Sequence, residues 1–111
     1  MTQTFQFSGR LTEAEHKRHV AIDFEVPEGT TRIVGRFRST PRRAEGALYD
    51  NMVCLTVIAP DGGRGARHNN PDRDFSISVH EASPGYVPGP IVPGRWQVVL
   101  DCFRLLGPVD W

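Results

Sequence analysis

Two histidines three residues apart, His16 and His19, form the first group in the sequence with metal-ligand chemistry. On one helical turn both imidazoles would face the same ion, and imidazole nitrogens are common zinc ligands. The segment changes to the alternating pattern of a strand at about His19, however, and no third ligand lies nearby in the sequence. We therefore expect a charged, solvated turn here rather than a metal site.

The segment from Asp61 to Asp74 is the densest polar stretch of the chain. Its glycines permit backbone conformations that point successive N–H groups at an anion. Its side-chain oxygens are ligands that calcium prefers, and they belong to Asn69, Asn70, Asp72 and Asp74. The spacing is not that of an EF-hand, and three arginines oppose a cation: Arg64, Arg67 and Arg73. We expect a structured loop between strands, with its own ion pairs.

Five arginines fall within residues 29–44, which contain no acidic side chain: Arg32, Arg36, Arg38, Arg42 and Arg43. The first three share one face of a predicted strand, so a positive stripe is expected there. Such a stripe suits a phosphate, a carboxylate or an acidic partner surface. Because the whole chain has no net charge, we favour the solvated face of an outer strand, where arginine also discourages pairing between sheet edges.

Groupings typical of catalysis are scarce in this sequence. There is no nucleophile elbow, no phosphate-binding loop of the Walker type and no His-x-His pair. The four histidines and the carboxylates are scattered without a spacing that supports a triad. We therefore predict no catalytic residue, no metal site and no cofactor for this chain by itself.

The elements that position these side chains must belong to a small fold, because the chain has 111 residues. That length suits a single domain over residues 1–111. Thirteen Lys and Arg balance thirteen Asp and Glu, which argues against nucleic acid or an anionic membrane as the partner. Nine prolines and eleven glycines favour short strands and tight turns over a helical bundle.

The expected cellular location follows from the first residues, the hydropathy and the cysteines. Residues 1–9 have neither the basic start nor the apolar run of a secretory signal. No stretch approaches the roughly 20 apolar residues of a membrane span. Cys54 and Cys102 lie in apolar runs, so we favour buried free thiols over a disulfide. A cytoplasmic protein is the expectation.

Alternation of apolar and polar side chains predicts six strands. They cover residues 4–8, 18–26, 32–38, 52–59, 75–79 and 95–102. Thr12 to Glu15 has the spacing of a capping box and predicts one helical turn. We expect an all-β domain, an antiparallel β-sandwich of jelly-roll or immunoglobulin-like type with about six to eight strands. Its core is expected to include Phe24, Leu55, Trp96 and Val98.

Three segments resemble a known family. They are residues 59–62 (APDG), 82–90 (ASPGYVPGP) and 94–100 (GRWQVVL), in that order. They resemble the β-sandwich that precedes the catalytic domain of carbaryl-hydrolase-like metal-dependent phosphoesterases in the PHP (polymerase and histidinol phosphatase) superfamily. In that family the metal ligands lie downstream of the sandwich, beginning near an H-x-H motif. The resemblance therefore implies a fold and no catalytic residue for this chain.

The resemblance implies a non-catalytic accessory or interaction domain that docks on a catalytic domain or another protein. The expected surface for a ligand or partner comprises Arg64, Arg67, His68, Tyr86, Arg36 and Arg38, with the Tyr86 hydroxyl in water. A homo-oligomer is also expected, formed through an unpaired edge strand or through the apolar C-terminal tail of Phe103, Leu105, Leu106, Val109 and Trp111. The alternatives are a small module that binds carbohydrate or calcium, and an enzyme in its own right.

Overall fold

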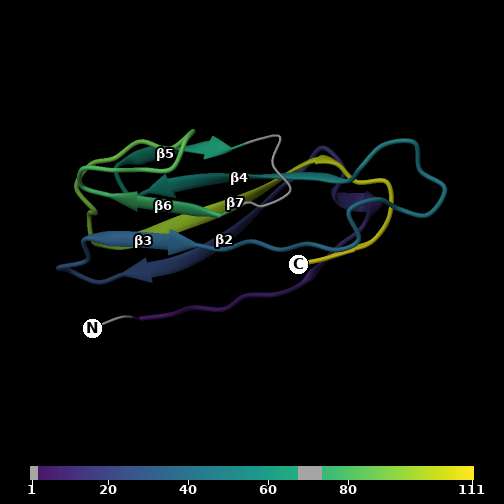
Figure 1. The fold of residues 1–111 in the computed structure, drawn as a ribbon. Coiled ribbons are helices and arrows are strands. Elements are labelled where there is room, and N and C mark those ends of the chain that lie inside the picture. Colours follow the sequence, from purple (N-terminus) through teal and green to yellow (C-terminus); the bar gives the residue numbers. More distant parts are fainter. Residues whose placement is uncertain (1–2, 68–73) are drawn as a thin grey trace.

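A computed structural model of this chain describes residues 3–67 and 74–111. Antiparallel strands make up nearly all the regular structure of these residues. In chain order the elements are β1 (Arg10–Leu11), η1 (Glu13–Glu15), β2 (His19–Val26), β3 (Arg32–Gly35), β4 (Met52–Ala59), β5 (Gly62–Arg67), β6 (Phe75–Ser78), β7 (Gly94–Arg104) and β8 (Val109–Asp110). The main sheet has the order β2-β7-β4-β5, and β3 and β6 form a second sheet (Figure 1). The predicted all-β class is confirmed.

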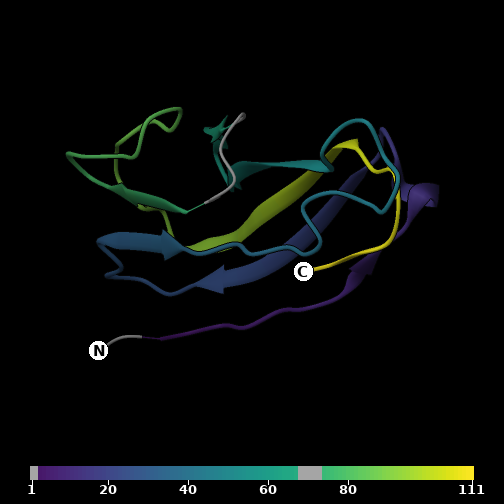
Figure 2. The same ribbon diagram turned by 45° about the vertical axis from the view of Figure 1, so that its right-hand side comes forward.

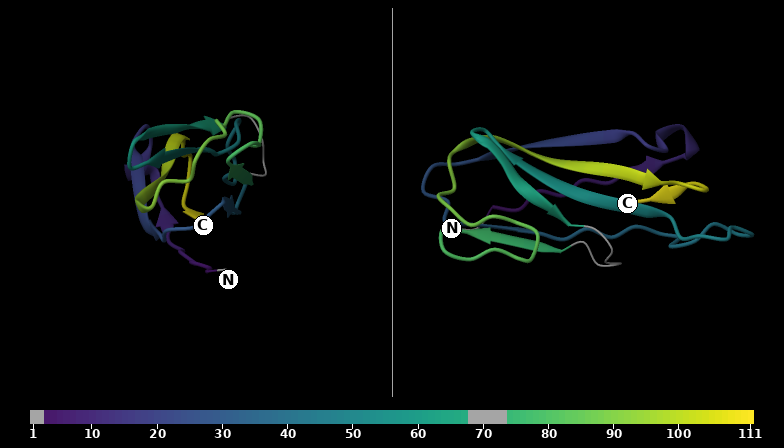
Figure 3. Two further views of the ribbon diagram at one scale, coloured as in Figure 1. Left: turned by 90° about the vertical axis from the view of Figure 1, so that its left-hand side faces the viewer. Right: turned by 90° about the horizontal axis from the view of Figure 1, so that it is seen from above.

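The two sheets surround one interior in a sandwich-like arrangement (Figure 2). The longest strand, β7, is central to the main sheet and pairs with β2 on one side and β4 on the other. A third pair, β1 with β8, lies apart from both sheets. The body is elongated, with extents of 48 × 23 × 23 Å (Figure 3).

The proline- and glycine-rich segment, residues 81–90, connects the two sheets. Val87 N–H donates to the carbonyl oxygen of Arg64 in β5 at 2.9 Å, and Ser83 N–H donates to that of Ser76 in β6 at 2.9 Å. The segment therefore satisfies backbone groups at the outer edges of both strands without becoming a strand itself. This joins β5 to β6 along one side of the body, while β2 and β3 border the other side.

The core fills the space between the sheets. Its largest fully buried side chains are Trp96, Leu55, Ile77, Leu100 and Leu105. Trp96 satisfies its indole N–H by donating to the carbonyl oxygen of Val92 at 2.8 Å, as a buried indole requires. Of the residues expected in the core, Trp96 and Leu55 are buried, whereas Phe24 and Val98 are partly buried and pack against the core from its margin.

The predicted turn before β2 forms as a short 3-10 turn, η1. The Thr12 hydroxyl oxygen accepts from Ala14 N–H at 3.2 Å, and the Glu15 carboxylate accepts from Thr12 N–H at 3.2 Å. These are the reciprocal bonds of a capping box, so that prediction is confirmed. Within the described ranges no helix is long and apolar enough to span a membrane.

Four of the six predicted strands are confirmed with small changes of boundary, and the third is shorter than expected. The four confirmed strands are β2, β4, β6 and β7. The shorter one, the third predicted strand, is β3, which ends at Gly35. A Cβ atom at Gly35 would lie 2.2 Å from the Phe75 ring. The close packing of this ring on the strand therefore excludes a larger residue at the point where β3 ends.

The prediction of a strand over residues 4–8 is wrong, although the segment has the alternating pattern. These residues are in no strand, and Phe5 and Phe7 are exposed. The Phe5 ring contacts the Phe24 ring, with the centroids 6.3 Å apart. A strand requires a backbone partner as well as a pattern, and among residues 3–9 only Gly9 makes backbone hydrogen bonds, with Trp111 next to the β1–β8 pair.

A strand was missed in the glycine-rich segment after Pro60, where we expected only a loop. Residues 62–67 form β5, which pairs with β4 at the edge of the main sheet. Gly65 has φ +114°, and a Cβ atom there would lie 2.2 Å from the carbonyl oxygen of Gly85. The glycine is therefore needed for the close approach of residues 81–90 to this strand.

The apolar C-terminal tail is covered by the chain itself. Leu105 and Val109 are buried in the core, and Trp111 stacks on Phe37 with ring centroids 6.4 Å apart. β8 pairs with β1 in this tail, while Phe103 stays exposed. The tail therefore offers less apolar surface for self-association than its sequence predicts.

Candidate functional site

The side chain of Arg64 lies inside the molecule, only 7% exposed. Its three nitrogens donate to backbone carbonyls of Val87, Gly89 and Pro90 at 3.1, 3.1 and 3.0 Å. Its guanidinium also lies over the Trp96 ring, 5.4 Å from the centroid. The expectation that Arg64 lines a partner surface is therefore corrected: this arginine fixes the course of residues 81–90.

Tyr86 is buried as well, at 7% exposure. Its hydroxyl donates to the Leu55 carbonyl oxygen at 3.2 Å, and its ring contacts Phe75 with centroids 5.3 Å apart. We expected this hydroxyl to be in water, and that expectation is wrong because the segment folds inward over β5 and β6. Tyr86 belongs to the core.

The other residues expected at a partner surface lie elsewhere. Arg36 and Arg38 are exposed, and Arg38 holds Asp74 in an ion pair with nitrogen–oxygen distances of 2.5 and 3.2 Å. This pair lowers the pKa of Asp74 below its usual value. Arg67 is the last residue of β5, and His68 lies outside the described residues. Among the described residues of this set, Arg64 and Tyr86 are buried, whereas Arg36 and Arg38 are exposed, so these four do not form one surface.

The candidate metal ligands do not converge either. His16 Nδ1 accepts from Leu105 N–H at 3.0 Å, and His19 Nδ1 lies 2.6 Å from the Asp101 carboxylate. Asn69, Asn70 and Asp72 of the predicted calcium loop lie outside the described residues. Across residues 3–67 and 74–111, no group of three or more His, Cys, Asp or Glu is placed to hold a metal ion.

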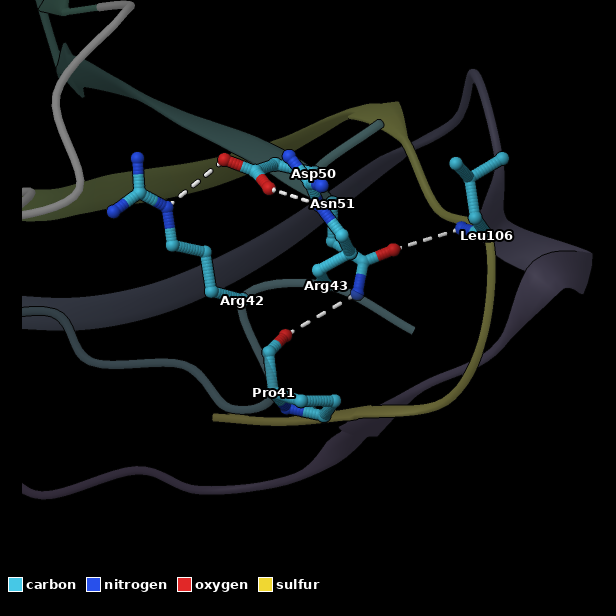
Figure 4. Close-up of polar contacts among 6 residues, drawn as sticks. All are labelled: Pro41, Arg42, Arg43, Asp50, Asn51 and Leu106. Atoms are coloured by element: carbon cyan, nitrogen blue, oxygen red, sulfur yellow. Dashed lines mark hydrogen bonds and ion pairs between the residues drawn. The ribbon is translucent and has the colours of Figure 1, made fainter. Parts of the chain in front are cut away.

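A loop over residues 42–50, between β3 and β4, is the most prominent surface feature of the chain. It projects from one end of the body (Figure 1, Figure 3). At its base Asp50 accepts from Arg42 Nε at 2.9 Å and from Arg43 Nε at 2.8 Å (Figure 4). These bonds, chiefly the one from Arg43, lower the pKa of Asp50. One carboxylate therefore closes the loop by binding two consecutive arginines.

Asn51 connects the base of the 42–50 loop to neighbouring segments through its backbone N–H and through both polar atoms of its side-chain amide. Its backbone N–H donates to the Arg42 carbonyl oxygen at 2.8 Å, and its side-chain N–H donates to that of Pro41 at 3.2 Å. Its side-chain oxygen accepts from Leu106 N–H at 2.8 Å (Figure 4). Thr40 also exchanges two backbone hydrogen bonds with Asp110. The loop is thus held on the C-terminal tail by backbone and side-chain bonds.

The second half of this projecting loop, directly before Asp50, presents two large side chains to solvent. Leu48 is 82% exposed and Tyr49 is 60% exposed. The Arg104 guanidinium, from the end of β7, lies over the Tyr49 ring at 5.2 Å from the centroid. Arg104 Nε is buried without a hydrogen-bond partner in the described residues. We call Leu48, Tyr49 and Arg104 the tip patch.

Two of the three residues of the tip patch, Tyr49 and Arg104, are of types that are enriched in binding hot spots. Tyrosine and arginine are enriched in such hot spots, where they combine a large contact area with a polar end. Sequence reasoning assigned no role to these residues. The available signal was an apolar Leu-Tyr pair inside a stretch otherwise made of charged, glycine and alanine residues. Arg104 joins them only through the fold, because 54 residues lie between Tyr49 and Arg104 in the sequence.

An open groove on the outer side of β3 and β6 is the second feature of interest. It has a volume of about 620 Å³ and is lined by Arg32, Ser76, His80, Glu81, Ala82, Ser83 and Pro88. Arg32 and Glu81 approach each other to 4.0 Å, and both are largely exposed. The groove therefore offers both signs of charge and the hydroxyl groups of Ser76 and Ser83 to a small polar molecule.

Comparisons with known proteins add no assignment to this geometry. No family model, no curated protein and no solved structure matches the chain.

Proposed function

We propose that this chain is a non-catalytic accessory domain that docks on a protein partner through the tip patch. The observation that carries the proposal is that Leu48 and Tyr49 are exposed although they directly precede Asp50 and Asn51, which fix the base of the 42–50 loop. A loop that is already ordered loses little conformational entropy on binding. The exposed side chains of such a loop therefore bind a partner at a lower entropic cost than those of a flexible loop would.

The chemistry of the tip patch indicates what the partner presents. Leu48 and the Tyr49 ring fit an apolar pocket, because burying them removes apolar surface from water. Arg104 Nε has no hydrogen-bond partner in the described residues, and we infer that a carboxylate on the partner would bind this guanidinium. We therefore propose a partner surface with an Asp or Glu beside an apolar pocket.

The family resemblance supplies the class of partner that we propose. The accessory sandwich that this chain resembles precedes a PHP-type phosphoesterase domain, so a catalytic domain of that type is the proposed partner, in the cytoplasm. Two of the resembling segments, residues 82–90 and 94–100, pack around Arg64 and Trp96. This supports a role of the shared motifs in maintaining the fold rather than in chemistry.

Selection from a library of displayed random peptides tests the docking proposal. The intact chain is the bait, and binding of the enriched peptides is then measured by isothermal titration calorimetry. We expect peptides that combine Asp or Glu with aromatic or aliphatic residues. Replacing Leu48 and Tyr49 by serine should weaken their binding about tenfold or more, since truncating a hot-spot residue costs about 2 kcal/mol.

The matched control is Val34→Ser, which removes an exposed apolar side chain from β3, away from the loop. It should leave peptide affinity unchanged. Equal thermal melting curves for both variants and the natural chain would show that the fold is intact. If no peptide is enriched, or if the Leu48/Tyr49 variant binds them as well as the natural chain does, the docking proposal is wrong.

The groove favours one alternative function, the binding of a small polar ligand such as a carbohydrate. Arg32, Ser76, His80, Glu81 and Ser83 supply hydrogen-bonding groups to its walls. A thermal-shift series with simple sugars tests this alternative, because a ligand of the folded state raises the melting temperature by mass action. A shift that disappears in Arg32→Ala would favour the groove over the tip patch, and the absence of any shift would remove the alternative.

A further inference from the structure

The outer edge of β2 has no backbone partner in the described part of the chain. β2 is an edge strand of the main sheet, and β7 is its only neighbour in that sheet. None of the backbone hydrogen bonds outside the strands involves residues 19–26. β3 follows β2 in the chain but belongs to the second sheet, so the edge of β2 stays open over eight residues.

The register of β2 on β7 identifies which backbone groups are unpaired. Cys102 N–H donates to the Arg18 carbonyl oxygen at 2.9 Å, so Arg18 faces β7. Along an antiparallel strand, residues whose backbone groups face the neighbouring strand alternate with residues whose backbone groups point away from it. The pairing of β2 with β7 has no register shift that would interrupt this alternation. The residues whose N–H and C=O groups point away from β7 are therefore His19, Ala21, Asp23 and Glu25.

The N-terminal segment of the same chain does not satisfy these groups. Residues 3–9 pass beside β2 (Figure 1), and Phe5 reaches the Phe24 ring. The segment makes a backbone bond only at Gly9, with Trp111. An open strand edge of this length is a template for another strand.

We propose that a second copy of this chain occupies the edge, with the two β2 strands antiparallel about a twofold axis at Ile22. This register places His19 opposite Glu25 of the partner subunit, and Ala21 opposite the partner's Asp23. All four outward-facing residues of each strand then exchange hydrogen bonds with the other copy. The interface is isologous, so the association closes at two copies.

Charge disfavours one neighbouring register, and the length of β2 disfavours the other. A shift of the axis to Asp23 would place that carboxylate opposite its own copy, and like charges directly opposite are destabilising. With the axis at Ala21, Glu25 would have no residue of the partner's β2 opposite it. On the inner face the proposed register places Val20 opposite the partner's Phe24, which joins apolar side chains that are only partly buried in one copy.

Sedimentation velocity of the intact chain tests the proposal. We expect a species of twice 12.4 kDa at concentrations on the order of 100 μM, which dissociates on dilution. Ala21→Pro removes an outward N–H and should weaken dimerisation about tenfold or more, because proline is tolerated on an edge strand but cannot donate to a new partner. Ala21→Ser keeps this N–H and is the matched control.

Amide hydrogen exchange provides a readout that needs no variant. The N–H groups of Ala21 and Asp23 should exchange more slowly at high protein concentration than at low concentration. A monomer at every concentration overturns the proposal, as does a dimer that Ala21→Pro does not weaken. A chain that dimerises only after residues 1–8 are removed would show that its own N-terminal segment blocks the edge, and would also overturn the proposal. Serine at Leu48 and Tyr49 should leave the dimer unchanged, so the docking proposal can fail independently.

Discussion

The guanidinium of Arg64 lies over the indole ring of Trp96, with its central carbon 5.4 Å from the ring centroid. The arginine comes from β5 and the tryptophan from β7, on either side of β4 in the main sheet. On its other side the same guanidinium binds the carbonyls of Val87, Gly89 and Pro90. This single side chain therefore connects the irregular 81–90 segment to the centre of the core.

Arg64→Met should destabilise the protein substantially. The substitution keeps most of the apolar stem but leaves three carbonyl oxygens without their donor. We expect a loss of about 2–4 kcal/mol in the free energy of unfolding, measured by urea denaturation. Arg95→Met at an exposed position of β7 is the control and should change stability by less than about 0.5 kcal/mol. Similar losses for both variants would contradict the role given to Arg64.

Gly65→Ala should be much more harmful than Gly63→Ala. Gly65 has φ +114°, and a Cβ atom would meet the Gly85 carbonyl oxygen at 2.2 Å, whereas nothing lies within 4 Å of a Cβ atom at Gly63. Strain and displacement of the 81–90 segment should lower the free energy of unfolding by about 3 kcal/mol or more at Gly65. The Gly63 variant should stay within about 0.5 kcal/mol of the natural protein. Chemical denaturation of the two variants side by side provides the comparison, and equal midpoints would refute the close contact.

Both cysteines should react slowly with thiol reagents in the folded protein. Cys54 and Cys102 are both buried thiols, and burial raises the pKa of Cys102 to about 11. The reactive thiolate is therefore scarce and shielded at neutral pH. We expect Ellman's reagent to modify two thiols per chain in denaturant and almost none without it over the same period. Rapid modification of native protein would show that one of these sites opens.

Acid should destabilise the protein through three carboxylates with lowered pKa values. Hydrogen bonds from arginine lower the pKa of Asp50, Asp74 and Asp110, whose ordinary value is 3.8. The unfolded chain takes up protons first as the pH falls, so their contribution is complete above 3.8 and is lost as the pH falls through the lowered values. The urea midpoint should therefore begin to drop as the pH approaches 3.8 and should continue to drop below it.

Asp50→Asn tests the part of this acid response that belongs to the 42–50 loop. Asparagine cannot titrate, so the variant should lose less stability on acidification than the natural protein. Because all three pairs lie near the surface, salt at about 1 M should also reduce the response. A natural protein with the same urea midpoint across this pH range would contradict the prediction.

The fold class was predictable because alternation is a local property of the chain. In β2, Val20, Ile22 and Phe24 turn toward the interior while the residues between them stay exposed, as the pattern predicts. The capping box at Thr12 and the buried thiols are local in the same sense, since neighbouring residues decide them. By contrast, the alternating segment at Phe5 is not a strand, because no other strand donates backbone bonds to it.

The candidate site was not predictable, because it depends on contacts between residues far apart in sequence. Arg64 resembles any solvent-exposed arginine in a glycine-rich stretch until residues 81–90 fold over it and bring carbonyl oxygens to its nitrogens. The tip patch needs Asp50 and Asn51 to fix the loop and Arg104 to reach Tyr49. The sequence alone thus determined the all-β class and the approximate positions of β2, β4, β6 and β7. Only the tertiary structure decided which charges are buried, which edge of the sheet stays open and which apolar side chains face solvent, since long-range packing and hydrogen bonding fix these outcomes.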